Sequence, residues 1–150
     1  MIKKYRKAIF IVTYARTKED VEYLILKRRL HWQGWEFPKG ALKFFETKRL
    51  AVGRELLEET GLTPLKIKKF DYSGKYDYDK IYSDRPKFKG QSFSLYAAEI
   101  EKAEVRINSI EHSDYKWVSF GKALKMLRWD NQKKALKIVH DWLKEKSQKA

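Results

Sequence analysis

The most informative run of the chain reads Gly40-Ala-Leu-Lys-Phe-Phe-Glu-Thr-Lys-Arg-Leu-Ala-Val-Gly-Arg-Glu-Leu-Leu-Glu-Glu-Thr-Gly-Leu62. Residues that favour a helix extend from Thr47 to Thr60, and Gly61 follows them as a typical helix stop. We therefore expect a helix over residues 47–60 with a loop on either side of it.

Three glutamates of this expected helix, Glu55, Glu58 and Glu59, fall on one face, because spacings of three and four residues stack on a helix. Like charges placed so closely repel one another. A solvated acidic face is the simpler interpretation, but the chain is strongly basic elsewhere. Mg²⁺ prefers carboxylate oxygens together with substrate phosphates, so a divalent metal site is the alternative.

The opposite face of the helix is expected to contact the core. It carries Leu50, Gly53, Leu56, Leu57 and Thr60. A glycine inside a helix is about 1 kcal/mol less favourable than alanine, so Gly53 is expected to permit close packing of the helix.

Composition limits the class of protein. The 150 residues suit a single domain, 1–150, and the hydrophobic content of 43% excludes a disordered linker. With 34 Lys and Arg against 20 Asp and Glu, the net charge is +14, which indicates a polyanionic partner or serves solubility alone. The absence of cysteine excludes disulfides, thiolate metal sites and a cysteine nucleophile.

No apolar stretch approaches the ~20 residues of a membrane span, so no membrane partner is expected. The apolar run Ala8–Val12 is too short for a signal peptide and lacks a cleavage site, which favours a cytoplasmic protein.

The remaining pattern alternates strands and helices, which indicates an α/β domain. Strands are expected over Ala8–Tyr14, Val21–Lys27, Leu65–Tyr72, Gln91–Ile100 and Tyr115–Val118, the first two as a hairpin. Residues 31–40 are expected as a loop with a short extended piece, and residues 73–87 as a long loop. Helices are expected from Ser119 to about Leu127 and from Asp130 onward, the last with an apolar core stripe of Ala135, Ile138, Val139 and Trp142.

The run over residues 40–62 resembles the Nudix box at every defined position. These positions are Gly40, Glu46 after five residues, Arg54-Glu55-Leu56 after seven more, Glu58-Glu59, and Gly61-Leu62. The resemblance implies a Nudix-type α/β/α sandwich around a mixed β-sheet, with the box as a loop–helix–loop. It also implies an enzyme that hydrolyses nucleoside diphosphates linked to another group.

The resemblance assigns roles within the box. Glu55, Glu58 and Glu59 are expected to bind Mg²⁺ or Mn²⁺, which would neutralise phosphate oxygens and activate a water. Either Glu55 or Glu58 is expected to take the proton. Arg54 and Glu46 are expected to form a structural pair, and Gly40 to act through its backbone. The carbonyl of Lys39 or Gly40 is expected to reach a metal.

A further metal ligand from outside the box is often found in the family. Glu111, just before an expected strand, is the first candidate and Glu99 the second. An ordinary loop glutamate is the alternative for Glu111, and the neighbouring His112 is interpreted as a polar surface residue.

The flanks of the box bear on the substrate. The segment Trp35–Gly40 resembles that of diadenosine tetraphosphate hydrolases, RNA 5′-pyrophosphohydrolases and mRNA decapping enzymes. In the first group a tyrosine follows the box by about sixteen residues, where Tyr78 stands beside Tyr76. Either ring is a candidate to stack on a purine, or both pack within a loop.

Several cations are candidates for the phosphate chain. They are Lys39, Lys80, Arg85, Lys87 and Lys89, with a solvated surface as the alternative for each. Trp32, Trp35 and Phe44 lie near the box, as candidates to flank a base, shield the site or pack.

Three hypotheses follow for the function. The first is hydrolysis of diadenosine tetraphosphate to ATP and AMP. The second is an RNA 5′-pyrophosphohydrolase, which the net charge favours. The third is a Nudix-fold module that binds RNA without turnover, against which the complete set of glutamates argues.

Overall fold

The structure, a computed structural model, describes residues 4–148. Within them the strands form a seven-stranded mixed sheet. Its central order is β3-β2-β1-β6-β5, with β4 paired to β1 and β7 paired to β2. The pairing of β1 with β6 is parallel and the other pairings are antiparallel. The bounds are β1 Lys4–Arg16, β2 Val21–Arg28, β3 Gly34–Glu36, β4 Lys39–Ala41, β5 Lys66–Asp77, β6 Phe88–Glu99 and β7 His112–Val118.

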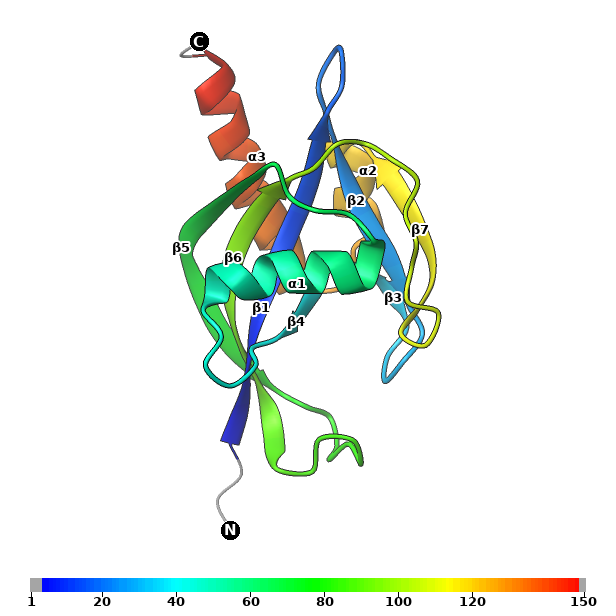
Figure 1. Cartoon of the computed structure of the whole chain (residues 1–150), viewed down its shortest axis with the longest axis vertical. Helices are drawn as coiled ribbons and strands as arrows, with labels where there is room; N and C mark the ends of the chain where they lie inside the picture. The colour runs from blue at the N-terminus through cyan, green and yellow to red at the C-terminus, as the bar shows by residue number, and fades with distance from the viewer. Residues whose placement is uncertain (1–3, 149–150) are drawn as a thin grey trace.

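Three helices cover the two faces of this sheet. Helix α1 spans Lys48–Thr60 and lies across one face, whereas α2, Phe120–Met126, and α3, Asp130–Gln148, lie on the other (Figure 1). The expected α/β/α sandwich around a mixed sheet is therefore confirmed. None of the helices within residues 4–148 combines the length and the apolar character needed to cross a membrane.

Capping residues in the sequence set the ends of helices α1 and α2. The Thr47 side chain accepts a hydrogen bond from the Leu50 N–H and caps α1, and Gly61 ends it at φ 76°. The Ser119 side chain accepts from the Lys122 N–H and caps α2 as expected. Both helices begin and end where the sequence placed them, within a residue.

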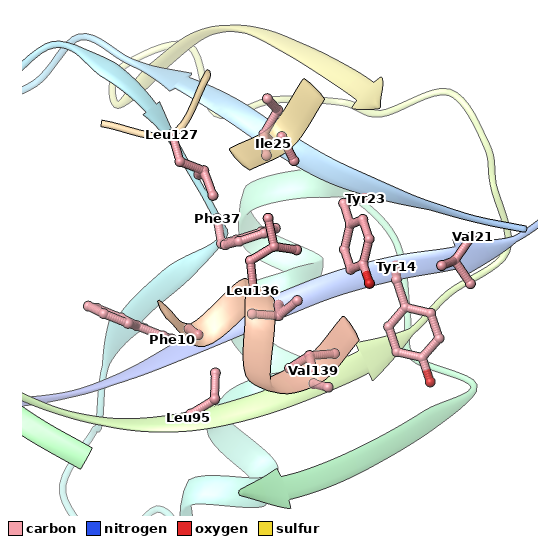
Figure 2. Close-up of a cluster of buried hydrophobic side chains, with 14 of the residues drawn as sticks. Phe10, Tyr14, Val21, Tyr23, Ile25, Phe37, Leu95, Leu127, Leu136 and Val139 are labelled. Carbon is pink, nitrogen blue, oxygen red and sulfur yellow. The ribbon is translucent and has the colours of Figure 1, made fainter. Parts of the chain in front are cut away.

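The sheet separates two hydrophobic clusters. Residues of β1 alternate between them, because successive side chains of a strand point to opposite faces. Phe10, Val12 and Tyr14 face α2 and α3, and Figure 2 shows the first and last of these among Tyr23, Leu136 and Val139. Ile9 and Ile11 face α1. This double burial explains the unbroken apolar run of β1. Of the stripe predicted for α3, Ala135 and Val139 are buried, and Ile138 and Trp142 are partly buried against the same cluster.

Two strands, β1 and β5, are longer than the sequence predicted. Strand β5 continues to Asp77, so the first five residues of the expected loop 73–87 are strand, and Tyr76 belongs to β5. Strand β1 begins at Lys4, ahead of the expected Ala8. Pairing with β6 explains both extensions. The pairing of β6 with β1 begins at Lys4, and its pairing with β5 continues as far as Asp77. Polar residues thus extend the strands beyond their apolar centres.

Candidate active site

Helix α1 turns two of its three box glutamates toward the sheet, and the third, Glu58, is half exposed. Glu55 and Glu59 are buried together with Ala51, Val52 and Leu56. The expected core face is therefore wrong in part. Leucine and glycine positions on it lie at the surface, since Leu50 is 68% and Leu57 52% exposed and a Cβ at Gly53 would meet no atom within 4 Å. Only Leu56 and Thr60 of that set are buried.

An ion-pair network fixes the loop before α1 to the helix. Arg54 Nε donates to Glu46 Oε2 at 2.6 Å and Nη2 to Glu46 Oε1 at 2.8 Å. The same guanidinium donates to the Ala41 carbonyl at 2.9 Å and to Glu55 Oε1 at 2.8 Å. Two-point contacts of this kind fix orientation as well as distance. Arg54 therefore holds the loop, β4 and the first carboxylate in one arrangement.

Gly40 brings β4 against Glu55. A Cβ added at Gly40 would overlap the Glu55 carboxyl group. Only a residue without a side chain leaves this space, so the glycine is required by the close approach. The expected action of Gly40 through its backbone has this steric basis, and the carboxylate of Glu55 lies directly over the strand.

The carboxylates line a cleft of about 220 Å³ between α1, β4 and the turn before β7. We call it the carboxylate cleft; its lining includes Glu55, Glu58, Glu59 and Glu111. Burial raises the pKa of Glu55 to about 6, with Arg54 opposing and Glu58 and Glu111 adding to the rise. Burial raises the pKa of Glu59 well above its usual range, and Glu55 and Glu36 raise it further. The cleft therefore concentrates poorly compensated negative charge.

Glu111 reaches the same cleft from a distant part of the sequence. Ligand atoms of Glu59, Glu111 and His112 lie within 4.8 Å of one another. The second candidate, Glu99, is excluded from the cleft because it lies at the end of β6, where its Oε1 accepts from Arg16 Nε at 3.3 Å and from Tyr14 Oη at 3.4 Å. The structure thus brings Glu111, and not Glu99, to the box glutamates.

The interpretation of His112 as a surface residue is wrong. The side chain is fully buried, and its Nε2 lies 3.0 Å from Glu36 Oε2. Its Nδ1 is buried without a hydrogen-bond partner among the described residues. The fold buries His112 because it opens β7 opposite Arg28 of β2, inside the sheet.

Sequence reasoning missed the charged group beneath the cleft. Glu36 is buried and contacts Arg28 Nη1 at 3.2 Å, Trp32 Nε1 at 3.2 Å and Lys39 Nζ at 3.5 Å. Burial opposes its ionisation, but Lys39, His112 and Arg28 outweigh burial and lower the pKa of Glu36 to about 2. Burial lowers the pKa of Lys39 to about 8, against the attraction of Glu36. Lys39 is therefore a buried member of this network.

An aromatic pocket of about 500 Å³ adjoins the cleft, and the two share Trp32 and Lys39. Tyr76 and Tyr78 both line it, which brings the two predicted base-stacking tyrosines together. The Tyr78 hydroxyl donates to Gln91 Oε1 at 3.1 Å and accepts from Arg85 Nη1 at 3.2 Å. The remaining lining comprises Phe10, Asp77, Asp79, Tyr82, Arg128, Trp129, Asp130, Asn131 and Gln132.

One polar atom of this pocket wall has no partner. Asn131 Oδ1 is buried and makes no hydrogen bond within residues 4–148, whereas the neighbouring Gln132 Oε1 accepts from the Phe37 N–H at 2.7 Å. The sequence predicts only a helix from Asp130 onward and assigns no binding role to Asn131. The polar residues following Trp129 were the available signal for a binding wall.

The predicted phosphate-binding lysines of the β5–β6 connection do not line either space. Lys80 lies 5.5 Å from the Tyr82 ring centroid and Lys89 4.9 Å from that of Tyr5, while Lys87 lines a separate hollow. Arginines take their place, since Arg6, Arg28 and Arg85 line the carboxylate cleft. Of these, the sequence had singled out Arg85 alone.

Two other aromatic candidates lie outside both spaces. Trp35 packs against the larger hydrophobic cluster, with Lys116 Nζ 5.6 Å from its ring centroid. Phe44 is 88% exposed. Of the three aromatic candidates, Trp32 therefore lines the two spaces and the other two do not.

The donor set of the carboxylate cleft fits a hard divalent cation. It offers carboxylate oxygens from Glu55, Glu58, Glu59 and Glu111, and raised pKa values mark two of them as short of positive charge. Oxygen-only sites of this kind suit Mg²⁺ or Mn²⁺. Arg54 compensates Glu55 and Glu58 in part, through Nη1 contacts of 2.8 and 3.2 Å.

Comparison with known proteins places these features in a family context. A family model described as NUDIX domain matches residues 4–141. The RNA pyrophosphohydrolase of Histophilus somni (strain 2336) is 32% identical over 104 residues, covering 62% of this chain and 54% of that protein. The chain therefore spans about half the length of this curated relative. The RNA pyrophosphohydrolase of Sulfurovum sp. (strain NBC37-1) is 24% identical over 150 residues, covering 95% and 96% of the two chains.

The fold is shared with solved structures. An Ap4A hydrolase from C. elegans, solved as a binary complex, has a TM-score of 0.74 to this chain at 23% identity. The match covers 93% of this chain and 98% of the other.

Proposed function

The chain belongs to the NUDIX domain family, and on this premise we propose that it is a divalent-metal-dependent pyrophosphohydrolase of nucleotide polyphosphates. We further propose that its substrate is a bis(5′-nucleosyl) tetraphosphate, with diadenosine tetraphosphate cleaved to ATP and AMP. The observation that carries this proposal is the junction of two spaces. The carboxylate cleft and the aromatic pocket adjoin, because Trp32 and Lys39 line both of them.

Glu55, Glu58, Glu59 and Glu111 would hold the Mg²⁺ or Mn²⁺, with the Lys39 carbonyl as a further oxygen donor. When bound, such an ion neutralises phosphate oxygens and lowers the pKa of an attacking water. Glu55 would accept the proton, because it lines the cleft and Arg54 Nη1 holds its Oε1 at 2.8 Å. Glu58 is half exposed and lies at the rim, which suits it to ion binding more than to proton transfer.

The phosphate chain would lie along the cleft between the arginines and the carboxylates. Arg6 and Arg85 supply positive charge there, and Arg28 Nη1 lies 4.0 Å from Glu111 Oε2. Arginine suits phosphate because its planar group donates two parallel hydrogen bonds. The lysines of the β5–β6 connection are left to attract the substrate from a distance.

The aromatic pocket would hold one adenosine. A space of about 500 Å³ lies within the usual range for small-molecule sites. Tyr78 and Trp129 offer ring surfaces, whereas the Trp32 ring already lies beside Arg28 and Lys39, 4.6 and 4.3 Å from its centroid. An amide pairs naturally with an adenine edge, donor to acceptor and acceptor to donor, and the unpartnered Asn131 Oδ1 supplies the acceptor. Rotation of the amide about χ2, a soft torsion, would turn that oxygen toward a base.

The second candidate is RNA 5′-pyrophosphohydrolase activity. Two observations favour it, the net charge of +14 and the two RNA pyrophosphohydrolases among the relatives. A module that binds RNA without turnover is disfavoured, because such a protein has no need of buried, mutually repelling carboxylates.

The test is incubation of the protein and Mg²⁺ with diadenosine tetraphosphate and, separately, with 5′-triphosphorylated RNA, with the products separated. We expect ATP and AMP from the first, and no product from either substrate in EDTA. Far faster release of pyrophosphate from RNA would replace the first choice by the second. RNA binding that persists in EDTA with no product under any condition would favour the non-catalytic module.

A further inference from the structure

Two adjacent aromatic side chains project into solvent from the loop between β4 and α1. Phe44 is 88% and Phe45 92% exposed, the highest exposures among the large apolar side chains of residues 4–148. Their ring centroids lie 4.1 Å apart at an interplanar angle of 49°. Single exposed apolar residues are ordinary, but a contacting pair of fully presented rings is an apolar surface. We call it the Phe44–Phe45 platform.

The backbone holds this platform in a strained conformation. Phe45 has φ 64°, in the left-handed region, where a side chain meets a steric penalty that glycine avoids. The loop is nevertheless fixed, because the Lys43 N–H donates to Glu46 Oε1 at 3.0 Å and the Glu46 N–H to the Lys43 carbonyl at 3.1 Å. Arg54 in turn holds Glu46. Glycine would suit position 45 better for stability, so the phenylalanine needs another reason.

The platform borders the carboxylate cleft. Lys43, the residue before it, places Nζ 4.0 Å from Oε1 of Glu58, which lines the cleft. Gly40 and Ala41, a few residues earlier in the same segment, also line the cleft. The aromatic pocket adjoins the cleft through other residues, Trp32 and Lys39. A substrate in the cleft thus has an aromatic surface beyond Glu58 in addition to the pocket.

Positive charge lies in the cleft that the platform borders. Lys43 directly precedes the two rings with its Nζ 4.0 Å from Glu58 Oε1, and Arg6, Arg28 and Arg85 line the cleft. Aromatic rings beside a groove that carries cations are the usual surface for stacking the bases of a polyanionic nucleotide. A stable interface with a second copy of the chain needs ~800 Å² of buried surface per partner, which is far more than two side chains supply.

We propose that the Phe44–Phe45 platform stacks the second nucleobase of a dinucleoside polyphosphate whose first base occupies the aromatic pocket. This inference rests on the proposed function and deepens it. One substrate then spans both aromatic surfaces, with its phosphate chain across the carboxylates between them. A mononucleoside polyphosphate would occupy the pocket and the cleft and leave the platform free.

The test compares Phe45→Gly and Phe44→Ala with the unaltered protein on two substrates, diadenosine tetraphosphate and adenosine 5′-tetraphosphate. We expect Phe45→Gly to raise KM for the dinucleotide about tenfold, the loss of one base–aromatic stack, and to leave the mononucleotide unchanged. Glycine fits φ 64°, so the melting midpoint of this variant should stay the same or rise. Leu65→Ala removes another exposed side chain, 61% exposed and remote from the box loop, as the matched control.

A binding measurement separates this inference from the proposed function. Titration of the protein with each nucleotide, with Ca²⁺ in place of Mg²⁺ and followed by tryptophan fluorescence, should show the same selective loss even if no substrate is hydrolysed. Equal binding of the dinucleotide by Phe45→Gly and the unaltered protein would overturn the platform. An equal loss of affinity for both nucleotides, or a loss confined to 5′-triphosphorylated RNA, would also overturn it. The same holds if Phe45→Gly abolishes binding to anionic vesicles or dissociates a dimer of the protein.

Discussion

Helices α1 and α3 cover opposite faces of one sheet, yet they bury opposite kinds of side chain. Helix α3 buries Ala135, Leu136, Val139 and Leu143, of which the predicted stripe contained Ala135 and Val139. Helix α1 buries two glutamates beside Ala51, Val52 and Leu56, and leaves two leucines at the surface. The same sheet therefore accepts one helix through apolar packing and the other with carboxylates in the interface.

The difference teaches what fixes the orientation of α1. Burying a carboxylate without a full partner is unfavourable, and rotation of the helix would bury Leu50 and Leu57 instead. The observed orientation is held by Leu56 and by the contacts of Arg54 with Glu46 and the Ala41 carbonyl. Burial of these carboxylates lowers the stability of the folded protein and leaves a charged surface in the cleft, which is a common arrangement at functional sites.

Leucine truncations on the two helices should differ most. Leu136→Ala removes a fully buried side chain of α3 and should lower the free energy of unfolding by about 2–5 kcal/mol. Leu57→Ala on α1 should change it by less than about 0.5 kcal/mol, because the side chain is 52% exposed. Urea titration measures both. A comparable loss in the two variants would mean that the exposed face of α1 is covered by something else.

Glutamate substitutions should separate activity from stability. Glu58→Gln and Glu59→Gln should each lower turnover by at least ~100-fold, equivalent to ~2.7 kcal/mol in the transition state. In EDTA, Glu59→Gln should raise the melting midpoint, since it removes a buried charge and keeps an acceptor for the Lys39 N–H, now 3.2 Å from Glu59 Oε2. Glu58→Gln should leave the midpoint nearly unchanged.

The control for these variants is Glu145→Gln, an exposed position on α3. It should alter neither turnover nor the melting midpoint. Near-normal turnover of both α1 variants would mean that the catalytic face is wrongly assigned.

Local signals explain why much of the fold was predictable. The apolar run of β1, the Thr47 and Ser119 caps and Gly61 each act within a few residues, and the structure contains all of them where expected. The face of α1 was not predictable in this way. Its periodicity places Leu50 and Leu57 opposite Glu55 and Glu59, as the structure has them, but which side meets the sheet depends on the ion pairs of Arg54, formed only in the folded chain.

The candidate site likewise contains some residues that the sequence predicts and others that it does not. Spacing places the box glutamates on one helix, whereas their metal-binding role and the choice of Glu111 as a further ligand come from the resemblance to the Nudix family. The charged network around Glu36 does not, because its partners Arg28 and His112 lie 8 and 76 positions away along the chain. A glutamate between Trp35 and Phe37 carries no sign in the sequence that it is buried. The register of β2 with β7 creates that environment.

The pH dependence of stability tests the buried charge of α1 directly. The pKa of Glu55 in the folded protein, about 6, exceeds its ordinary value of 4.5. The folded state therefore holds the proton more tightly, and the stabilisation is complete below pH 4.5 and lost as the pH rises through 6. In EDTA the unaltered protein should lose about 2 kcal/mol relative to Glu55→Gln across this range.

The pKa of Glu46 is shifted in the opposite direction to that of Glu55, so the two residues can be compared. Its hydrogen bonds from Arg54 lower the pKa to about 2, so its stabilisation is complete above pH 4.5 and is lost as the pH falls through 2. The difference between the unaltered protein and Glu46→Gln should therefore shrink only in acid. A Glu55→Gln curve parallel to that of the unaltered protein would contradict the uncompensated burial of Glu55.

Gly53→Ala is the smallest change and the sharpest test of which side of α1 is free. The sequence suggested that this glycine permits close packing, but the structure leaves open space where a Cβ would lie. Alanine should then raise the free energy of unfolding by up to ~1 kcal/mol through helix propensity and loss of freedom in the unfolded chain, with turnover unchanged. The midpoint of urea unfolding measures this gain. Gly40→Ala is the matched contrast, because its Cβ would displace the Glu55 carboxyl group and should lower turnover. Destabilisation by Gly53→Ala would place a neighbour against the leucine face and would remove the distinction between α1 and α3.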